Sequence, residues 1–392
     1  MKPTVFITDG HWRKSLAAVR ALGREGIGVE VGESTRLATA AFSRYCRKTK
    51  VYPSPLLRPE AFVACLLDTL SHRPYQMLLP MEDETLRLVS DHRHEFSRLT
   101  YLLIPSPEKL NIARNKAEVL RLAGRLGLPT PRTWFIEDTA QLRELSDRLP
   151  YPVVIKPRSA SGALGVSYVE TAGDLVGQYL STHKRFPYPL IQERIPRGGA
   201  GYGASFLMDD NHRVKAAFVH KRLREYPVTG GASTLRESVR QDDIRDMART
   251  LLKALGWVGV AMVEFKLDPR DGIPKLMEIN PRFWGSLSLA VASGVNFPYL
   301  LYRISRGEDI RPVESYRIGI RCRWLLPGDI LHFFHNPERM KLTPSFFRLL
   351  DRRMSYDILS LDDPLPTLGR LLTPLTFLYD EDMKHRLRMR KP

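Results

Sequence analysis

The chain has 392 residues and a formal net charge of +17, and its 43% hydrophobic and 26% charged residues form the mixture of a folded protein. These values exclude a disordered chain, and the length predicts two or three domains. Three widely separated cysteines, at positions 46, 65 and 322, exclude a disulfide framework and offer no zinc-binding spacing, which is typical of a cytoplasmic protein.

The first 110 residues predict a small open α/β domain. Ser15 is expected to cap an apolar-periodic helix between two short strands, and this β–α–β unit implies parallel strands. The predicted strands cover residues 5–8, 27–31, 77–80 and 101–104, and a second helix begins near Asp83. His11 follows the first strand, where open α/β sheets bind ligands, so it is a candidate substrate residue; a solvated loop histidine is the alternative.

Residues 111–190 predict a second unit, with a helix over 115–126 and a strand over 153–156 that ends at Lys156. A loop rich in Ser and Gly follows, and successive backbone N–H groups in such a loop can form an anion-binding nest. Its candidate phosphate ligands are Ser159, Ser161, Gly162 and Gly165. A plain turn is the alternative, and the loop does not match GxxxxGK[ST], which excludes a Walker-type site.

The strongest chemical signal is a hairpin over residues 258–279, with the turn sequence Asp-Pro-Arg-Asp-Gly at 268–272. Antiparallel pairing around this turn places Glu264 opposite Glu278, and Asn280 shares the strand face of Glu278. Two facing glutamates repel, and a divalent cation such as Mg²⁺, which prefers oxygen ligands, would remove that repulsion. A pair of solvent-facing glutamates is the alternative. Before the hairpin, strands are predicted near 190–195, 203–208 and 214–220, and a helix near 244–255.

The remaining stretches are interpreted from their composition. Residues 283–302 carry no formal charge but contain Ser, Asn, Pro and Gly, which predicts a buried helix with a loop rather than a membrane span. Residues 311–392 contain aromatic clusters that would pack on the core, form a dimer face or touch a membrane. The positive charge suits an acidic substrate or an anionic membrane, and no recognised nucleic-acid motif accompanies it.

Taken together, the motifs resemble those of the ATP-grasp superfamily. In chain order they are Lys116, Lys156 with its Ser/Gly loop, residues 192–195, Glu264 and the run Glu278–Arg282. The segments at 220–224, 229–234 and 283–286 resemble in particular the predicted ATP-dependent carboligases related to the ATP-binding domain of the carbamoyl phosphate synthetase large chain. The resemblance covers about residues 1–310.

That resemblance implies an ATP-grasp fold of mixed α/β and α+β class. It divides the chain into a Rossmann-like pre-ATP-grasp domain (1–110), a lid subdomain (111–190), a core subdomain with the metal site (191–310) and a C-terminal extension of unknown role (311–392). ATP would lie between the lid and core subdomains, with Lys116 and Lys156 on its phosphates. The adenine would be held by residues of the motif Gln192, Glu193, Arg194 and Ile195.

The remaining roles are also implied by the resemblance. Glu264, Glu278 and Asn280 would ligate one or two Mg²⁺ or Mn²⁺ ions. Arg282 would be catalytic, stabilising the transferring phosphoryl group, with a structural ion pair as the alternative. Arg222 and Arg224 would contact the substrate or a phosphate, or else form an exposed basic strand. Residues 196–203 contain no acid, so the ribose contact has no candidate.

We therefore expect an ATP- and Mg²⁺-dependent carboxylate–amine ligase that works through an acyl phosphate and releases ADP and phosphate. Its partners would be a small-molecule carboxylate and amine, with no nucleic acid; a homodimer and peripheral membrane contact are left open. One rival hypothesis is a kinase of the same fold that leaves a stable phosphorylated product. The other is a basic nucleotide-binding or nucleic-acid-binding protein without turnover.

Overall fold

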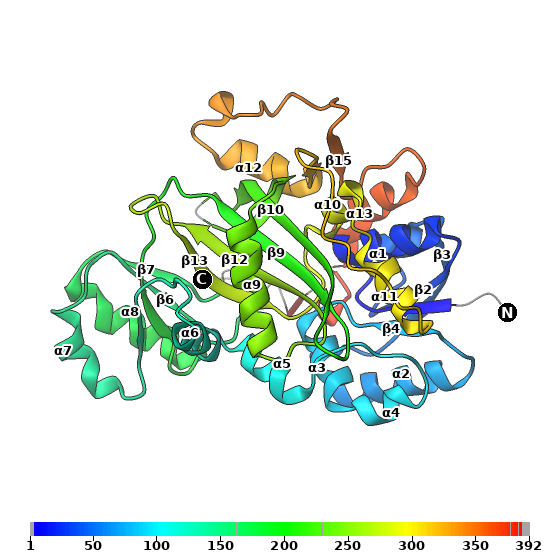
Figure 1. Ribbon diagram of the computed structural model, residues 1–392, viewed down its shortest axis with the longest axis horizontal. Helices are drawn as coiled ribbons and strands as arrows, with labels where there is room; N and C mark the ends of the chain where they lie inside the picture. Colours follow the sequence, from blue (N-terminus) through cyan, green and yellow to red (C-terminus); the bar gives the residue numbers. More distant parts are fainter. Residues whose placement is uncertain (1–3, 161–163, 229, 377, 383, 386–392) are drawn as a thin grey trace.

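The computed structural model describes residues 4–160, 164–228, 230–376, 378–382 and 384–385. Three β-sheets organise these residues: an N-terminal sheet, a small sheet that stands apart at the left of the view, and a large central sheet (Figure 1). The N-terminal unit and the small sheet lie on different sides of the large sheet, which therefore connects them.

The N-terminal sheet is parallel and has the strand order β3–β2–β1–β4. Its strands are β1 (Thr4–Ile7), β2 (Gly28–Glu33), β3 (Cys46–Val51) and β4 (Met77–Leu79). Side chains alternate along β1, so Val5 and Ile7 share a core with α1 (Arg13–Arg24), while Phe6 shares one with α2 (Pro59–Ser71) and α3 (Asp83–Asp91). The short helices η1 (Thr39–Phe42) and α4 (Arg93–Ser97) complete this unit.

Two local predictions for the N-terminal unit are wrong, and one strand was not predicted. Ser15 does not cap α1: the helix begins at Arg13, and the Ser15 hydroxyl donates to the Asp9 carbonyl at 2.6 Å. Residues 101–104 form a single bridge, from Tyr101 to Met77, because Pro105 and then α5 (Pro107–Arg114) follow directly. Strand β3 was not predicted, because its sequence Cys-Arg-Lys-Thr-Lys-Val has the charged character of an edge strand.

The small sheet is antiparallel, with the strand order β5–β8–β6–β7. Its strands are β5 (Thr133–Phe135), β6 (Val153–Lys156), β7 (Ser167–Val169) and β8 (Leu190–Glu193). The helices α7 (Leu142–Ser146) and α8 (Ala172–Arg185) pack on it, with η2 (Thr139–Gln141) before them, and share its apolar core. Helix α6 (Lys116–Arg125) begins at the predicted residue Lys116, and the Asn115 side chain caps it by accepting from the Ala117 N–H.

The large sheet has seven strands in the order β13–β12–β9–β10–β11–β14–β15. They are β9 (Gly201–Met208), β10 (Val214–Tyr226), β11 (Ala232–Ser238), β12 (Gly259–Leu267), β13 (Pro274–Asn280), β14 (Arg321–Arg323) and β15 (Met354–Tyr356). All neighbouring pairs are antiparallel except β14 with β15. Helix α9 (Asp242–Ala254) covers one face, and its apolar residues share a core with the sheet and with α6.

The uncharged stretch at 283–302 is helical and buried, as predicted, but it contributes to two short helices rather than to one helix with a loop. These are α10 (Leu287–Ser293) and α11 (Phe297–Ser305), and both contribute to the core that they share with α1 and β1. This core attaches the N-terminal unit to the large sheet. Among the residues that the structure describes, no helix has the length and apolar character needed to cross a membrane.

The C-terminal segment, residues 311–385, adds two strands to the large sheet and contacts the N-terminal unit. It supplies β14 and β15, the turn η3 (Leu325–Asp329), and the helices α12 (Ile330–His335), η4 (Arg339–Lys341) and α13 (Leu365–Thr376). The Arg20 guanidinium on α1 donates to the Asp363 carboxylate at 2.8 Å and to the Ile358 carbonyl at 2.8 Å. Both Arg20 and Asp363 are buried, so a buried ion pair joins α1 of the N-terminal unit to the C-terminal segment.

Candidate functional site

The predicted carboxylate pair lies on the β12–β13 hairpin. Glu264 is paired directly with Glu278, and Met262 with Asn280, which confirms the predicted pair; a register shift between Glu264 and Phe265 separates it from the pairs nearer the turn. The amide nitrogen of Asn280 donates to Glu264 Oε1 at 3.0 Å. The side chains of Glu264 and Glu278 are 18% and 24% exposed, so the pair is neither fully buried nor a freely solvated surface feature.

Each glutamate of the pair has its own cation. Arg222 Nη2 on β10 lies 2.5 Å from Glu264 Oε1, and Lys116 Nζ on α6 lies 3.0 Å from Glu278 Oε2. Burial raises the pKa of Glu264, because Arg222 does not fully offset burial and the charge of Glu278. Burial acts in the same sense on Glu278, but Lys116, Lys156 and Arg222 outweigh it and hold the pKa of that carboxyl below its usual value.

Lys156 ends β6 on the small sheet, opposite this pair. Its Nζ donates to Gln192 Oε1 at 2.7 Å. Burial lowers the pKa of Lys156 to about 8; the like charges of Lys116 and Lys266 act in the same direction, while Glu278 opposes them. Two of the predicted phosphate ligands, Lys116 and Lys156, therefore lie near Glu278.

The predicted phosphate loop follows Lys156. Lys116 Nζ donates to the Ala160 carbonyl at 2.5 Å, and the Lys116 N–H donates to the Arg158 carbonyl at 2.8 Å, so the start of α6 is attached to the start of the loop. Gly165 has a φ of +70°, and a Cβ there would meet the Phe186 ring at 2.5 Å. Of the other predicted ligands, Ser159 is described, whereas Ser161 and Gly162 lie outside the described residues.

The predicted adenine strand, β8, presents its residues to different surroundings. Gln192 is buried and holds Lys156, and its amide nitrogen also donates to Thr133 Oγ1 at 2.8 Å. The Glu193 carboxylate accepts from the Arg132 N–H at 2.9 Å and pairs with Arg270 at 3.1 Å, so this carboxylate does not join the lysines. Arg194 pairs with Glu170 at 2.7 Å, and Ile195 is buried.

Arg282 follows β13 and joins the site to the N-terminal unit. Its Nε donates to Asp83 Oδ2 at 3.0 Å, at the first residue of α3, and its Nη1 donates to the Phe283 carbonyl at 3.1 Å. The nearby charges of Asp83 and Glu82 outweigh burial and raise the pKa of Arg282 above its usual value. The alternative for Arg282 was a structural ion pair with Glu264 or Glu278, and that partner is wrong, because the pairing acid is Asp83 of α3.

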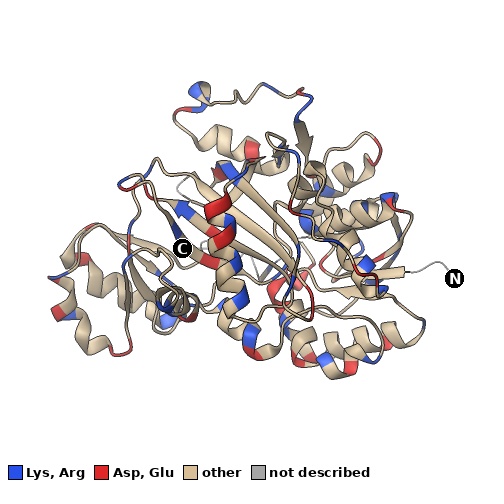
Figure 2. Cartoon of the chain, viewed as in Figure 1, with Lys and Arg blue, Asp and Glu red and all other residues tan. Residues whose placement is uncertain are grey.

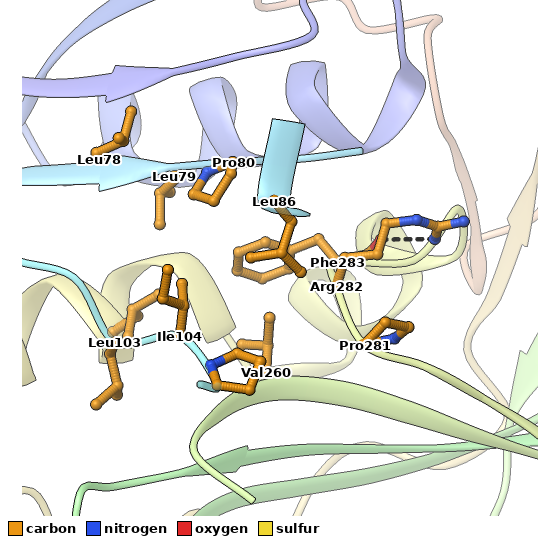
Figure 3. Close-up of a pocket in the computed structure, with 12 residues that line it drawn as sticks. Leu78, Leu79, Pro80, Leu86, Leu103, Ile104, Val260, Pro281, Arg282 and Phe283 are labelled. Atoms are coloured by element: carbon orange, nitrogen blue, oxygen red, sulfur yellow. Dashed lines mark hydrogen bonds between the residues drawn. The ribbon is translucent and has the colours of Figure 1, made fainter. Parts of the chain in front are cut away.

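A small apolar cavity adjoins Arg282 between the N-terminal unit and the hairpin. Its walls include Leu79, Leu86, Ile104 and Val260, and Figure 3 shows the Arg282 guanidinium pointing away from these apolar side chains. The cavity therefore places apolar side chains behind Arg282 and contributes no further polar side chain. The polar face of Arg282 lies on the side of Asp83.

Several charged residues near the carboxyl ends of β1, β2 and β4 were not predicted as site residues from the sequence. Lys14 is buried and its Nζ lies 2.6 Å from Glu82 Oε1. Asp9 has a φ of +60°, and burial together with Glu33 and Glu82 raises its pKa to about 6. The predicted residue His11 is buried beside them, with its N–H donating to Glu33 Oε2 at 3.0 Å. Asp9, His11, Glu33 and Glu82 lie at or shortly after the ends of parallel strands, and that position is the signal that could have found the acids; Lys14 lies in the first turn of α1.

Arg224 is not at the site, contrary to prediction. Residues two apart on a regular strand share a face, but the pairing of β10 with β11 shifts register on both sides of Arg224. The side chain of Arg224 is buried and its Nη1 donates to Asp329 Oδ2 at 2.7 Å, on the C-terminal segment. Arg222 pairs with Glu264, so only one of the two arginines lies at the candidate site.

The donor set suits a hard cation held jointly with phosphate oxygens. The described residues contain no cluster of three or more His, Cys, Asp and Glu side chains in metal-binding geometry. Two carboxylates and one amide oxygen on neighbouring strands are compatible with Mg²⁺, which commonly takes one or two carboxylates and completes its shell with water and substrate phosphates. Glu264, Glu278 and Asn280 therefore fit such an ion.

Comparison with known proteins agrees with this geometry. Residues 208–326 match the family described as "ATP-grasp in the biosynthetic pathway with Ter operon". The Campylobacter jejuni biotin carboxylase, solved as a β-γ-ATP complex, superimposes with a TM-score of 0.68 at 16% identity, over 82% of this chain and 74% of that one. The fold is therefore the ATP-grasp fold, and residues 208–326 are similar in sequence to an ATP-grasp family.

Two curated relatives are similar in sequence. The carbamoyl phosphate synthase large chain of Rubrobacter xylanophilus is 27% identical over 215 residues, which are 53% of this chain and 20% of that relative. The D-aspartate ligase of Enterococcus faecium is 26% identical over 245 residues, which are 56% of each chain. The chain thus matches about a fifth of the synthase and about half of the ligase.

Proposed function

We propose that the protein is an ATP-dependent carboxylate–amine ligase. In the first step a carboxylate oxygen of one substrate attacks the γ-phosphorus of ATP, the bond to the bridging oxygen breaks, and ADP leaves. In the second step the amine nitrogen attacks the acyl carbon, phosphate leaves, and the amine loses a proton as the C–N bond forms. The sequence similarity to a D-aspartate ligase supports a reaction of this class.

The observation that carries the proposal is the meeting of three cations with the paired carboxylates. Lys116, Lys156 and Arg222 come from a helix, the small sheet and the large sheet, and each lies near Glu264 or Glu278. Such an arrangement suits a polyanion bound together with a metal ion, because side chains of both signs then have partners. A core ion pair alone would need only one partner for each carboxylate.

The residues divide the chemical work. Lys116, Lys156 and Arg222 bind phosphate oxygens and orient the nucleotide. Glu264, Glu278 and Asn280 would hold Mg²⁺, which supplies neutralisation of the charge that develops on the phosphates. Arg282 stabilises charge on the transferring phosphoryl group with its planar fork, and Asp83 positions that guanidinium by accepting from Nε at 3.0 Å.

The test measures ADP and phosphate release over a panel of carboxylates and amines. We expect release to require both substrate classes, and Glu278→Gln and Arg282→Ala each to lower kcat by about 100-fold or more. Asp271→Asn is the matched control, since it removes a 40% exposed carboxylate from the turn of the same hairpin and should leave the rate unchanged.

Other outcomes would contradict the ligase assignment. Full turnover by Glu278→Gln or Arg282→Ala would show that these residues are not in the active site. ADP release with a stable phosphorylated product and no free phosphate would indicate a kinase. Salt-sensitive binding of polyanions with no turnover would indicate the binding protein instead.

A further inference from the structure

The segment from α12 up to β15, residues 330–353, carries large apolar side chains that are exposed. It runs along the upper border of the molecule in the view of Figure 1, and we call it the α12–β15 segment. Its most exposed apolar side chains are Phe334 at 69%, Met340 at 72%, Phe347 at 63% and Leu350 at 95%. A folded protein seldom gathers this much apolar surface over so short a stretch unless something covers it, so the segment marks an interaction surface.

The aromatic rings of the segment pack on one another and on a buried charged group. The ring centroid of Phe333 lies 4.3 Å from that of Phe346 and 5.8 Å from that of Phe334. The Arg323 guanidinium on β14 lies 4.5 Å from the centroid of the Phe346 ring, and its Nε also lies 2.6 Å from the buried Asp329. The aromatic residues are therefore attached to the large sheet.

The backbone of the segment is attached to the large sheet at two further points. The Arg224 guanidinium on β10 donates to the Pro344 carbonyl, and the Tyr356 hydroxyl on β15 donates to the Leu349 carbonyl at 2.5 Å. The segment cannot fold back over its apolar side chains without breaking these contacts. Their exposure is thus a property of the fold, and a partner has to cover them.

The same segment has a surplus of positive charge. It contains five Lys or Arg residues and two acids, and Figure 2 shows Lys and Arg at several points along this upper border. Both acids have a cation close by, since Glu338 lies 3.8 Å from Lys341 and Asp351 lies 3.1 Å from Arg348. The three other cations are exposed to solvent: Arg339, Arg352 and Arg353. A partner of this segment should therefore be both apolar and anionic.

We propose that the α12–β15 segment docks the protein on an anionic membrane surface. The exposed phenylalanine, methionine and leucine side chains enter the boundary between the headgroups and the acyl chains, and the exposed arginines attract the negatively charged headgroups. An apolar contact or a basic patch alone gives weak, reversible binding, and the two together are what stable peripheral binding needs.

The composition of the segment favours a lipid surface over nucleic acid or a second copy of the chain. Phenylalanine and arginine suit nucleic acid, but Met340 and Leu350 have no ring on which a base could stack, so nucleic acid would leave them uncovered. A second copy would bring its own net charge of +17 and the same surplus of cations to the interface, and the two would repel. An anionic bilayer offers apolar volume and negative charge together.

This inference does not depend on the ligase proposal, because the segment contains no residue of the candidate active site. The test is sedimentation of the full chain with vesicles. We expect binding to vesicles of phosphatidylcholine and phosphatidylglycerol in equal parts, little binding to pure phosphatidylcholine, and loss of binding at about 0.5 M salt.

Two independent variants test the apolar contact. Phe347→Ser/Leu350→Ser and Phe334→Ser/Met340→Ser should each weaken binding to the mixed vesicles by about tenfold or more, since each removes two apolar side chains from the interface. Both should keep the wild-type melting temperature, because these side chains are mostly exposed. The matched control is Leu368→Ser/Leu371→Ser, which removes two half-exposed leucines from α13 and should leave binding unchanged.

A second pair of variants tests the electrostatic contact. Arg352→Gln/Arg353→Gln should weaken binding to the mixed vesicles and flatten its salt dependence, because the removed charges face the headgroups. Arg93→Gln/Arg98→Gln is the control: it lowers the net charge by the same amount through two exposed arginines of the N-terminal unit, and binding should change little.

Three outcomes would overturn the proposal. The first is a wild-type protein that does not sediment with the mixed vesicles. The second is vesicle binding that both apolar variants retain in full. The third is a partner of another class: a dimer that the apolar variants dissociate, or a single-stranded oligonucleotide that competes with the vesicles and loses affinity in the same variants.

Discussion

Burial lowers the pKa of Lys156, which we propose as a phosphate ligand, and this changes how its charge depends on pH. Its ammonium group contacts Gln192 and lies among Lys116, Lys266 and Glu278, and its pKa is lowered to about 8. In the free protein a substantial fraction of Lys156 is therefore neutral at mildly alkaline pH. A phosphate bound at Lys156, as we propose for ATP, would favour the charged form, so nucleotide binding and protonation of Lys156 would be linked.

This linkage predicts the pH dependence of ATP binding. Above about pH 8 the free protein must take up a proton to bind, so the affinity should fall by up to about tenfold per pH unit, while below pH 8 it should be nearly constant. Calorimetry in two buffers of different ionisation enthalpy would report proton uptake at pH 9. Lys156→Arg keeps the charge at all these pH values and should abolish both effects; a wild-type affinity that does not change between pH 8 and 10 would contradict the assignment.

At the residue scale, the turn at 268–272 was sufficient to predict a hairpin in which Glu264 pairs with Glu278. In the structure a register shift between Glu264 and Phe265 completes that pairing. Arg224 shows the limit: its direction depends on a bulge, and its partner Asp329 lies 105 residues away in the chain. No periodicity in the sequence contains either piece of information.

At the scale of elements, η3 contacts the large sheet through one carboxylate, that of Asp329. Asp329 is fully buried, and Oδ2 lies 2.7 Å from Arg224 Nη1 on β10 and 2.6 Å from Arg323 Nε on β14. Thr234 on β11 donates to Oδ1 at 2.9 Å. Three strands therefore depend on one acid, and removing its charge would leave two buried guanidinium groups without an anion.

We expect Asp329→Asn to lower the free energy of unfolding by about 3–5 kcal/mol, because breaking a buried charge cluster costs the desolvation of the partners left behind. Denaturant titration followed by circular dichroism would measure it. The matched control is Asp309→Asn, since Asp309 also pairs with a cation, Lys215, but its side chain is 95% exposed. Equal stability of the two variants would show that Asp329 is not the fastening point.

Elements with a clear apolar period were predictable, and elements without one were not. The helix over α6 and the strands β6, β12 and β13 follow buried apolar runs that sequence patterns expose. Strands β14 and β15 have three residues each and take their place only by pairing with β11 and with each other. Their existence is a property of the assembled sheet rather than of their own sequences.

At the scale of the whole molecule, the C-terminal segment is part of the folded body. It supplies two strands of the large sheet and the buried carboxylates Asp329, Asp357 and Asp363, whose arginine partners lie on β10, β11, β14 and α1. The family resemblance in the sequence ends near residue 310, so this dependence could not be read from motifs.

A chain that ends at residue 310 should therefore fail to fold stably. It would expose the edge of β11 and leave Arg20, Arg224 and Arg236 without their anions. We expect it to be aggregated or rapidly digested in limited proteolysis, without a cooperative melting transition. A chain that ends at residue 385 is the control and should melt like the full chain; a cooperative transition in the shorter chain would show that residues 311–392 are an independent appendage.

The Arg20–Asp363 contact also has a consequence for how the chain matures during synthesis. Its two residues are 343 positions apart. At the usual pace of translation, the carboxylate reaches the ribosome exit on the order of tens of seconds after α1 has left it. During that interval the Arg20 guanidinium, which is buried in the folded protein, is still open to solvent, so the N-terminal unit acquires its final covering only after residue 363 has been made.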